Sequence, residues 1–269
     1  MIKRIQDLAS MSDRKGCVTF TDFLNLNEQN ICHQTMQKFS WIKGETFGGY
    51  EGAERRIAAF VPEEPLWGSE SSPHSVGGQR LSPEHSCISS PGGIMYPIHC
   101  IHIVPRTPRF AESLTHRDFL GALMSLGIDR SKTGDIAVTD KEAYLFCSAQ
   151  FSDLICQELT SVRRTQVVCS ACSMEDFSYT PATETIRGSI ASVRLDAVMA
   201  LAFGASRSSL LSLIEGGSVY VNGKLITTNA YVLKENDIVS VRKMGRFRYL
   251  RTGGTTRKGR TFAEIQKFV

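Results

Sequence analysis

The sequence predicts an α+β protein built from more than one domain, and three observations lead to this prediction. First, the chain has 269 residues, of which 42% are hydrophobic and 22% are charged, so it is long and apolar enough to bury a substantial core. Second, its central part alternates strand and helix patterns in the order β-α-β-β-α-β. Third, two short amphipathic helix patterns near the C-terminus are followed by several short strand patterns.

The first segment, residues 1–61, is predicted to form an N-terminal α/β region. Residues 26–39 have helical spacing, and residues 41–62 read as two extended segments around the turn Gly48-Gly-Tyr-Glu-Gly52. Residues 62–97 then contain 6 Pro, 8 Ser and 5 Gly. Such a segment buries too little apolar surface to offset its ordering entropy, so we expect a long loop or insertion there.

The next segment, residues 98–175, is predicted to form a ferredoxin-like (βαββαβ) domain. Thr115-His-Arg-Asp118 has the spacing of a capping box and opens one helix, and residues 151–162 carry a second helix pattern. This order is that of a split βαβ unit, a fold with many functions besides RNA binding. The strands lack an aromatic-rich ribonucleoprotein signature, so direct evidence for RNA contact here is weak. The strand patterns lie at residues 101–104, 135–138, 143–146 and 165–168.

The C-terminal block begins with two short helix patterns. Residues 194–204 carry apolar side chains at helical spacing, and Gly204 is placed to end that helix. Ser206 is a natural N-cap for the second helix, which Gly216 or Gly217 ends.

A small sheet is predicted to follow these helices. The dipeptide Asn222-Gly223 indicates a tight hairpin, because both central residues of such a turn adopt positive φ. A last strand pair is expected at residues 238–241 and 246–250. Its second strand alternates Arg246 and Arg248 with aromatic residues, which predicts one cationic face.

Positive charge is concentrated at the C-terminal end. Residues 187–269 contain 14 Lys and Arg against 5 Asp and Glu, whereas the rest of the chain contains 17 against 22. A one-sided basic block attracts polyanions, of which nucleic acid is the commonest. The alternative is a solvated face or a disordered basic tail. We expect residues 251–269 to form a basic C-terminal tail.

The helix starts offer a way to bind phosphate. Helix N-terminal amides and the helix dipole favour anions, so Ser206-Arg-Ser-Ser209 is a candidate phosphate contact that Arg194 could join. Simple capping by Ser206 and solvation of Arg207 are the structural alternatives.

The C-terminal block carries five spaced motif elements: Arg194-Leu-Asp196, Ser206-Arg207, Ile214 with Gly217, Val219-Tyr-Val-Asn-Gly223 and Asp237. In this order and spacing they resemble the S4 RNA-binding domain over residues 187–250. Asn236 departs from the glycine that is usual in this domain, but Asn also tolerates the left-handed conformation. The resemblance implies that RNA binds at the two helices and the adjoining hairpin.

Further motifs extend the resemblance to nearly the whole chain: Gly48-Gly-Tyr-Glu-Gly-Ala-Glu-Arg-Arg56, residues 114–124 with Gly127-Ile128, Gly134-Asp-Ile136 and Gly245-Arg-Phe-Arg248. Together with the S4 elements they are similar to the YlmH family of bacterial S4-domain proteins. Residues 62–97 depart from the acidic connection that is usual in that family. The resemblance implies a non-enzymatic, cytoplasmic RNA-binding factor at the ribosome. Large-subunit rRNA and peptidyl-tRNA are its implied ligands, in rescue or quality control of stalled translation.

Two sets of side chains are predicted to contact RNA, in a monomer that needs no cofactor, metal or membrane. The first set lies in the S4-like block: Arg194, Ser206, Arg207, Ser209, Lys224, Arg242, Lys243, Arg246 and Arg248. The second lies in the N-terminal half: Arg55, Arg56, His116 and Arg117.

Two other function classes remain open. An RNA-modifying enzyme of the S4-linked pseudouridine synthase or methyltransferase type would need a catalytic domain that the sequence does not reveal, since glycine-rich cofactor loops, Walker loops and nucleophile elbows are absent. Asp196 lies inside an S4 helix, where its plain role is to cap or to pair locally. A protein-interaction adaptor, whose basic face meets an acidic partner, is the other alternative.

Cysteine and histidine patterns raise the question of a metal site. The eight cysteines are scattered, and the first residues lack the apolar centre of a signal peptide, so reduced thiols in the cytosol are expected. Cys169-x-x-Cys172 is one half of a zinc ribbon, and His99 and His102 flank another cysteine, Cys100. Ordinary strand thiols are the preferred interpretation.

Overall fold

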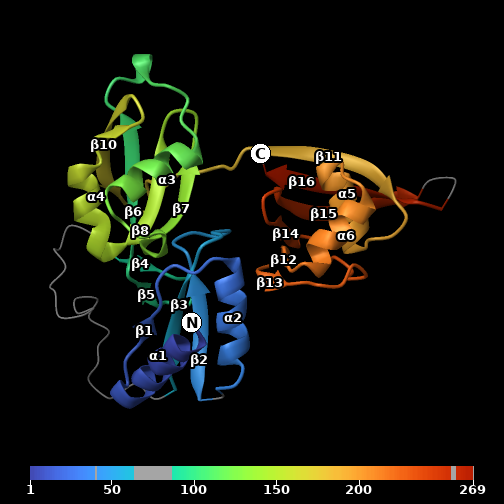
Figure 1. Ribbon diagram of the computed structural model, residues 1–269, viewed down its shortest axis with the longest axis horizontal. Coiled ribbons are helices and arrows are strands. Elements are labelled where there is room, and N and C mark those ends of the chain that lie inside the picture. The colour runs from blue at the N-terminus through green and yellow to red at the C-terminus, as the bar shows by residue number, and fades with distance from the viewer. Residues whose placement is uncertain (40, 64–86, 256–258, 269) are drawn as a thin grey trace. The chain divides into compact units, whose positions relative to one another are not determined.

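The computed structural model describes residues 1–39, 41–63, 87–255 and 259–268, in two compact units, Met1–Tyr179 and Thr180–Val269. Both units combine helices with antiparallel sheets (Figure 1), so the predicted α+β class is confirmed. The greater part of the predicted insertion, residues 64–86, lies outside the described residues.

The N-terminal part of the first unit packs two helices on a three-stranded antiparallel sheet of order β1-β3-β2. The predicted helix and the two extended segments are confirmed as α2, β2 and β3. The helix α2 begins at Asn25, which forms a capping box with Glu28. The sequence patterns had not indicated α1, which ends at Gly16 in the left-handed conformation with φ 58°. The elements are α1 (Ile2–Lys15), β1 (Thr19–Phe20), α2 (Leu26–Met36), β2 (Ile42–Phe47) and β3 (Ile57–Pro62).

The rest of the first unit is the ferredoxin-like domain. Its strands follow the order β7-β8-β6-β10-β9 and pair antiparallel, as in a split βαβ unit. The capping box predicted at Thr115 and Asp118 opens α3. The second helix is shorter than predicted, because the chain turns into a short strand at Ser161. The elements are β6 (Ile98–Pro105), η1 (Pro108–Phe110), α3 (His116–Ser125), η2 (Arg130–Lys132), β7 (Thr133–Val138), β8 (Ala143–Ser148), η3 (Ala149–Phe151), α4 (Ser152–Glu158), β9 (Ser161–Val162) and β10 (Thr165–Cys172).

Both faces of this sheet are covered. One face packs on α3 and α4 around Phe119 and Leu145. The other packs on the N-terminal part of the chain, where Phe23 lies in one core with Phe146. Phe177, beyond the last strand, adds an edge-on contact to Phe146 with ring centroids 5.2 Å apart. Aromatic stacking of RNA bases on an open sheet, as in ribonucleoprotein domains, therefore has no free surface here.

The shared core corrects the domain boundaries predicted at residues 61 and 98. The segments 1–61 and 98–175 are one compact unit, because β3 and the ferredoxin-like sheet bury their apolar side chains against each other. The end of the predicted insertion also belongs to this core, since it forms β4 (Ile88–Ser89) and β5 (Met95–Tyr96) and buries Tyr96 completely.

The second unit is a six-stranded antiparallel sheet with two helices packed on one face (Figure 1). The strand order is β11-β16-β15-β14-β12-β13. The helix end predicted at Gly204 is confirmed by its left-handed φ of 60°, and Ser206 caps the next helix as predicted. The elements are β11 (Thr183–Ile190), α5 (Leu195–Phe203), α6 (Arg207–Glu215), β12 (Val219–Val221), β13 (Lys224–Leu225), β14 (Ile238–Val241), β15 (Gly245–Thr255) and β16 (Thr261–Phe268).

The basic C-terminal tail predicted for residues 251–269 is wrong. The strand β15 continues to Thr255, and β16 then returns between β11 and β15 with Ala263 and Ile265 buried beneath the helices. Apolar and polar side chains alternate along residues 263–266, which is a strand pattern that the surrounding basic charge obscured. The unit therefore extends beyond the predicted S4 range of 187–250 at both ends.

Hydrophobic helices are short throughout the described residues. No single helix there is long and apolar enough to cross a membrane, and only α5 and α6 pass such a test together, as a pair bent by 119°. The buried side chains of α5, including Val198 and Met199, pack in the core of the second unit.

Candidate nucleic-acid interface

One buried carboxylate joins the starts of α5 and α6. The side chain of Asp196, in the first turn of α5, is 6% exposed, and its Oδ1 accepts a hydrogen bond from Arg194 Nε at 3.1 Å. Its Oδ2 lies 3.9 Å from Nε of Arg207, the first residue of α6. The two arginine side chains remain 41% and 52% exposed. The local pairing expected for Asp196 is thus confirmed, and it brings two predicted phosphate contacts together.

The serines at the start of α6 form a compact cap. Ser206 Oγ accepts a hydrogen bond from the Ser209 amide at 3.3 Å, and the Ser209 hydroxyl donates to the Ser206 carbonyl at 2.8 Å. Both hydroxyls therefore have a structural role in the cap. All four residues from Ser206 to Ser209 are exposed, so the positive end of the helix dipole faces solvent at Arg207. This arrangement favours a phosphate group.

The hairpin predicted at Asn222-Gly223 is present, with φ of 49° and 79° at the two residues. Asn222 Nδ2 donates to Oδ1 of Asp237 at 2.8 Å, which ties the turn to the loop before β14. Asn236 in that loop adopts φ 68°, so the left-handed conformation expected there is confirmed. The hairpin holds Lys224 exposed on β13.

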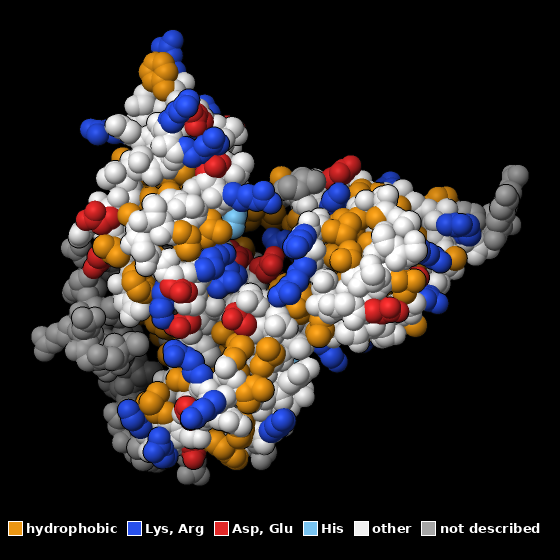
Figure 2. Space-filling view, viewed as in Figure 1, with side chains coloured by type: hydrophobic (Ala, Val, Ile, Leu, Met, Phe, Trp, Pro, Cys, Tyr) orange, Lys and Arg blue, Asp and Glu red, His pale blue; other side chains and the backbone are white. Residues whose placement is uncertain are grey.

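The other cationic candidates of this unit lie away from the helix starts and the hairpin. Arg242 and Lys243 are exposed in the turn between β14 and β15. Arg246 and Arg248 alternate along β15 with Phe247, which is fully buried against the helices, so the predicted cationic face is confirmed. The candidate residues therefore lie in three places: the helix starts, the hairpin and the turn between β14 and β15, and the face of the sheet opposite the helices. Figure 2 shows basic side chains, with exposed apolar ones among them, over the visible surface of this unit.

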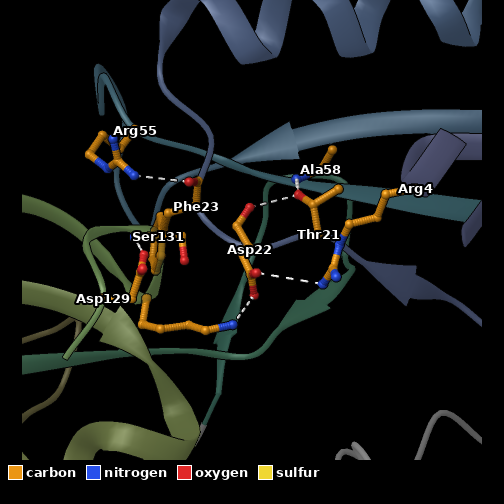
Figure 3. Close-up of polar contacts among 9 residues, drawn as sticks. Arg4, Thr21, Asp22, Phe23, Arg55, Ala58, Asp129 and Ser131 are labelled. Carbon is orange, nitrogen blue, oxygen red and sulfur yellow. Dashed lines mark hydrogen bonds and ion pairs between the residues drawn. The ribbon is translucent and has the colours of Figure 1, made fainter. Parts of the chain in front are cut away.

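Arg55 has structural partners inside the first unit, beside its prediction as an RNA contact. Its Nη2 donates to the carbonyl oxygens of Phe23 at 2.9 Å and Arg130 at 3.1 Å, and its Nε donates to the carbonyl of Thr133 at 2.9 Å. Burial lowers the pKa of Arg55. Figure 3 shows the hydrogen bond from Arg55 to the carbonyl of Phe23, together with the ion pair of Asp22 with Arg4. The guanidinium thus joins the N-terminal region to the ferredoxin-like domain.

The other arginine of this motif is also tied to its own loop. Arg56 Nε donates to the carbonyl of Ala53 at 2.9 Å. The carboxylate of Asp135 completes the joint, since it accepts hydrogen bonds from the Tyr50 hydroxyl and from the amides of Glu54 and Arg55. The Gly-Gly-Tyr-Glu-Gly-Ala-Glu-Arg-Arg motif therefore has a structural explanation.

His116 and Arg117 are the exposed first residues of α3. Partial burial, Arg130 and Arg117 lower the pKa of His116, against the opposing effect of Asp135. Sequence reasoning missed Arg130, whose Nη1 donates to the carbonyl of Gly134 at 2.9 Å. Burial and the neighbouring Arg55 lower the pKa of Arg130 to about 10, so it remains protonated at neutral pH. Arg117 and Arg130 give this end of the unit positive charge, whereas the lowered pKa leaves His116 neutral at neutral pH.

The sheet separates Cys169 from the other two cysteines considered as metal ligands. Cys169 packs in the core under α3 and α4, whereas Cys172 packs on the opposite face beside Cys100. Successive side chains of a strand point to opposite faces of the sheet, so two residues three positions apart, such as Cys169 and Cys172, lie on opposite faces. His102 pairs instead with Glu142 at 2.9 Å. Among the described residues, which include all eight cysteines as free thiols, no group of three metal-ligating side chains occurs.

Sequence reasoning also missed four residues that lie together on the sheet of the second unit. Arg187 on β11 and Arg251 on β15 both hydrogen-bond to Glu264 on β16, and Phe262 is exposed on the same strand. The signal that could have found them is the alternation of apolar and polar side chains along residues 263–266.

Two helices that start beside exposed arginines and pack on a small sheet define the second unit as an S4-type RNA-binding module. Family models agree: residues 193–239 match "S4 domain" and residues 96–176 match "Putative RNA-binding domain in YlmH". The chain is 30% identical over 243 residues to ribosome-associated protein quality control protein P2 of Bacillus subtilis (strain 168), covering 88% of this chain and 82% of that protein. The chain therefore belongs to the YlmH family. A solved structure, cell division protein ylmH from Streptococcus pneumoniae, matches with a TM-score of 0.46 and 18% identity over 65% of this chain and 90% of the other.

Proposed function

We propose that this protein binds RNA at the ribosome, with the starts of α5 and α6 as its main phosphate contact. The observation that carries the proposal is the arrangement at Asp196, which holds Arg194 and Arg207 beside an exposed helix N-terminus. Two guanidinium groups and a helix dipole at one place match the geometry and charge of a phosphate. Ser206 and Ser209 shape this site, and Lys224 adds charge on the neighbouring hairpin.

The ribosome is proposed as the target because of the family. The relative from Bacillus subtilis is named a ribosome-associated quality control protein, and both matched family models are RNA-binding domains by name or class. We propose large-subunit rRNA and peptidyl-tRNA as ligands, bound by a monomer in the cytoplasm during rescue of stalled translation. Arg242, Lys243, His116 and Arg117 are proposed as additional contacts. The protein acts by binding, without chemistry on the RNA.

Charge reversal at the helix start tests this proposal. Arg207→Glu places a carboxylate where the phosphate is expected, but a carboxylate at a helix N-terminus is tolerated by the helix dipole. We expect loss of co-sedimentation with ribosomes and of binding to a structured RNA hairpin. The variant should remain folded, with a melting temperature lowered only by the loss of the ion pair between Arg207 and Asp196. Lys3→Glu, an exposed charge reversal in the first turn of α1, is the matched control and should bind normally. Normal binding by the Arg207→Glu variant would refute the site.

The proposed absence of chemistry is tested separately. Ribosomal RNA and tRNA incubated with the full chain should keep their nucleoside masses, with and without added S-adenosylmethionine. A new modified nucleoside would support an RNA-modifying enzyme instead.

A further inference from the structure

The sheet of the second unit has a second surface that the helices do not cover. Side chains on this outer sheet face alternate with the buried ones, so those next to Ala263, Ile265 and Phe247 point away from α5 and α6. The face carries four arginines and one carboxylate, a balance that suits a polyanion. We define the outer sheet face by Arg187, Arg246, Arg248, Arg251, Phe262, Glu264 and Phe268.

Glu264 fixes two of these arginines in place. Its Oε1 accepts a hydrogen bond from Arg187 at 2.8 Å and its Oε2 accepts one from Arg251 at 3.0 Å. The Glu264 side chain is 16% exposed, whereas the arginine side chains are 70% and 65% exposed. The bonds from the two arginines lower the pKa of Glu264, so the triad keeps one net positive charge. Each guanidinium has five N–H donors, and donors remain for a phosphate.

A hollow of about 390 Å³ lies beside this triad, lined by Arg187, Arg251, Gly253, Gly254 and Phe262 among others. The volume falls in the range of roughly 300 to 1,000 Å³ that is typical of small-ligand sites. A side chain at Gly253 would contact the Cβ of Phe262 at 3.5 Å, whereas a Cβ at Gly254 would meet nothing within 4 Å. Gly253 therefore lies against Phe262, whose side chain is 47% exposed.

An exposed aromatic ring beside arginines is the usual platform for an unpaired base. Bases of single-stranded RNA stack on aromatic side chains while basic residues contact the backbone. We propose that the hollow at Phe262 takes an unpaired base of single-stranded RNA, with Arg187 and Arg251 at the adjoining phosphates. This inference rests on the proposed function, because the ligand is again RNA. The site, however, lies on the face of the sheet that α5 and α6 do not cover.

The surface is matched to single strands rather than duplexes. Bases inside a duplex are already stacked on each other, so they cannot reach Phe262, whereas the arginines can contact the phosphates of either form. Loss of the ring should therefore affect single-stranded RNA much more than a duplex of equal length.

The test uses the full chain and a short oligoadenylate that contains one 2-aminopurine. Binding is followed by fluorescence anisotropy, and stacking by quenching of the 2-aminopurine. We expect Phe262→Ala to weaken binding about 5- to 100-fold and to abolish the quenching, and Phe262→Trp to retain both. The matched control is Phe110→Ala, because Phe110 is also exposed and also lies beside an arginine, Arg109, with 5.8 Å from its Cζ to the ring centroid.

Each outcome has a definite meaning. Unchanged binding and quenching in the Phe262→Ala variant, or an equal loss in the Phe110→Ala variant, would overturn the stacking site. Binding to vesicles of anionic lipid that depends on Phe262, without any binding to the oligoadenylate, would also overturn it. The Arg207→Glu variant separates the two proposals: it should lose the structured hairpin RNA but still quench 2-aminopurine. If it binds the hairpin normally, the proposed function at the helix starts fails, whatever Phe262 does.

Discussion

Arg207 on α6 reaches back to Asp196 on α5, with 3.9 Å between Nε of the arginine and Oδ2 of the carboxylate. The same carboxylate binds Arg194, so three residues from two helices act as one group. Because Asp196 is buried and the arginines are exposed, the carboxylate positions the cations and does not itself meet a ligand. This arrangement explains why an acidic residue lies at the centre of a cationic surface.

The first prediction concerns this carboxylate. Asp196→Ala removes the common anchor of Arg194 and Arg207, so we expect weaker binding to a structured RNA hairpin even though the net positive charge rises. Asp196→Asn keeps the size and a hydrogen-bond acceptor for Arg194, and its affinity should fall between the wild type and the alanine variant. Anisotropy titrations of the three proteins check this order. Higher affinity in the alanine variant would mean that charge alone, and not position, determines binding.

The second prediction concerns the arginines of β15. Replacing Arg246 and Arg248 by Ala should weaken RNA binding and make the dependence of log affinity on log salt shallower, by about 0.7 to 0.9 for each phosphate that the variant no longer neutralises. The measurement is a titration repeated over a series of salt concentrations. Arg246 lies over the ring of Phe268, 4.5 Å from Cζ to the centroid, so its replacement also removes a contact within the sheet. Circular dichroism of the variant should therefore be measured to show that it is folded. An unchanged slope in a folded variant would remove these two residues from the interface.

The third prediction concerns the joint inside the first unit. Asp135 accepts three hydrogen bonds from the loop that carries Tyr50 and Arg55, so Asp135→Ala leaves several donors without their acceptor. Hydrogen bonds to charged groups contribute roughly 1.5 to 3 kcal/mol each. Because Asp135 is only half-buried, water can replace part of the lost bonding, and we expect the free energy of unfolding to fall by about 2 to 4 kcal/mol. Urea denaturation checks this. Asp140→Ala, in an exposed turn, is the control and should leave stability unchanged.

Local signals in the sequence predicted the helix caps and turns well. Thr115, Ser206, Gly204 and the Asn222-Gly223 turn all have the predicted roles, because each depends on a few neighbouring residues and on backbone geometry. The order of strands in the ferredoxin-like sheet was also predictable, because the element order β-α-β-β-α-β is typical of the split βαβ unit.

Features that depend on distant parts of the chain were not predicted. Arg55 reads as an exposed cation in the motif, but it hydrogen-bonds to carbonyl groups far away in the sequence, such as that of Thr133, for which the separation is 78 residues. The strand β16 was missed because its pairing partner β11 lies far upstream and basic residues precede it. The outer sheet face appears only when these two strands are placed side by side.

The last prediction concerns the smallest piece that folds as an S4-type module. Residues 180–269 form one compact unit, in which β16 lies between β11 and β15 and buries Ala263 and Ile265 under α5. A fragment of residues 180–269 should therefore unfold cooperatively and bind a structured RNA hairpin. A fragment of residues 187–250, the range that resembles the S4 domain by sequence, lacks β16 and the end of β15.

In the shorter fragment the edge of β15 that pairs with β16 is open, and Ala263 and Ile265 no longer pack in the core with Phe247 and Tyr249. We expect this fragment to be unfolded or aggregated, as judged by circular dichroism and size-exclusion chromatography. A folded fragment of residues 187–250 would show that β16 is an addition to a core that is already complete. A folded fragment of residues 180–269 that fails to bind RNA, while residues 1–179 bind it, would place the function in the other unit.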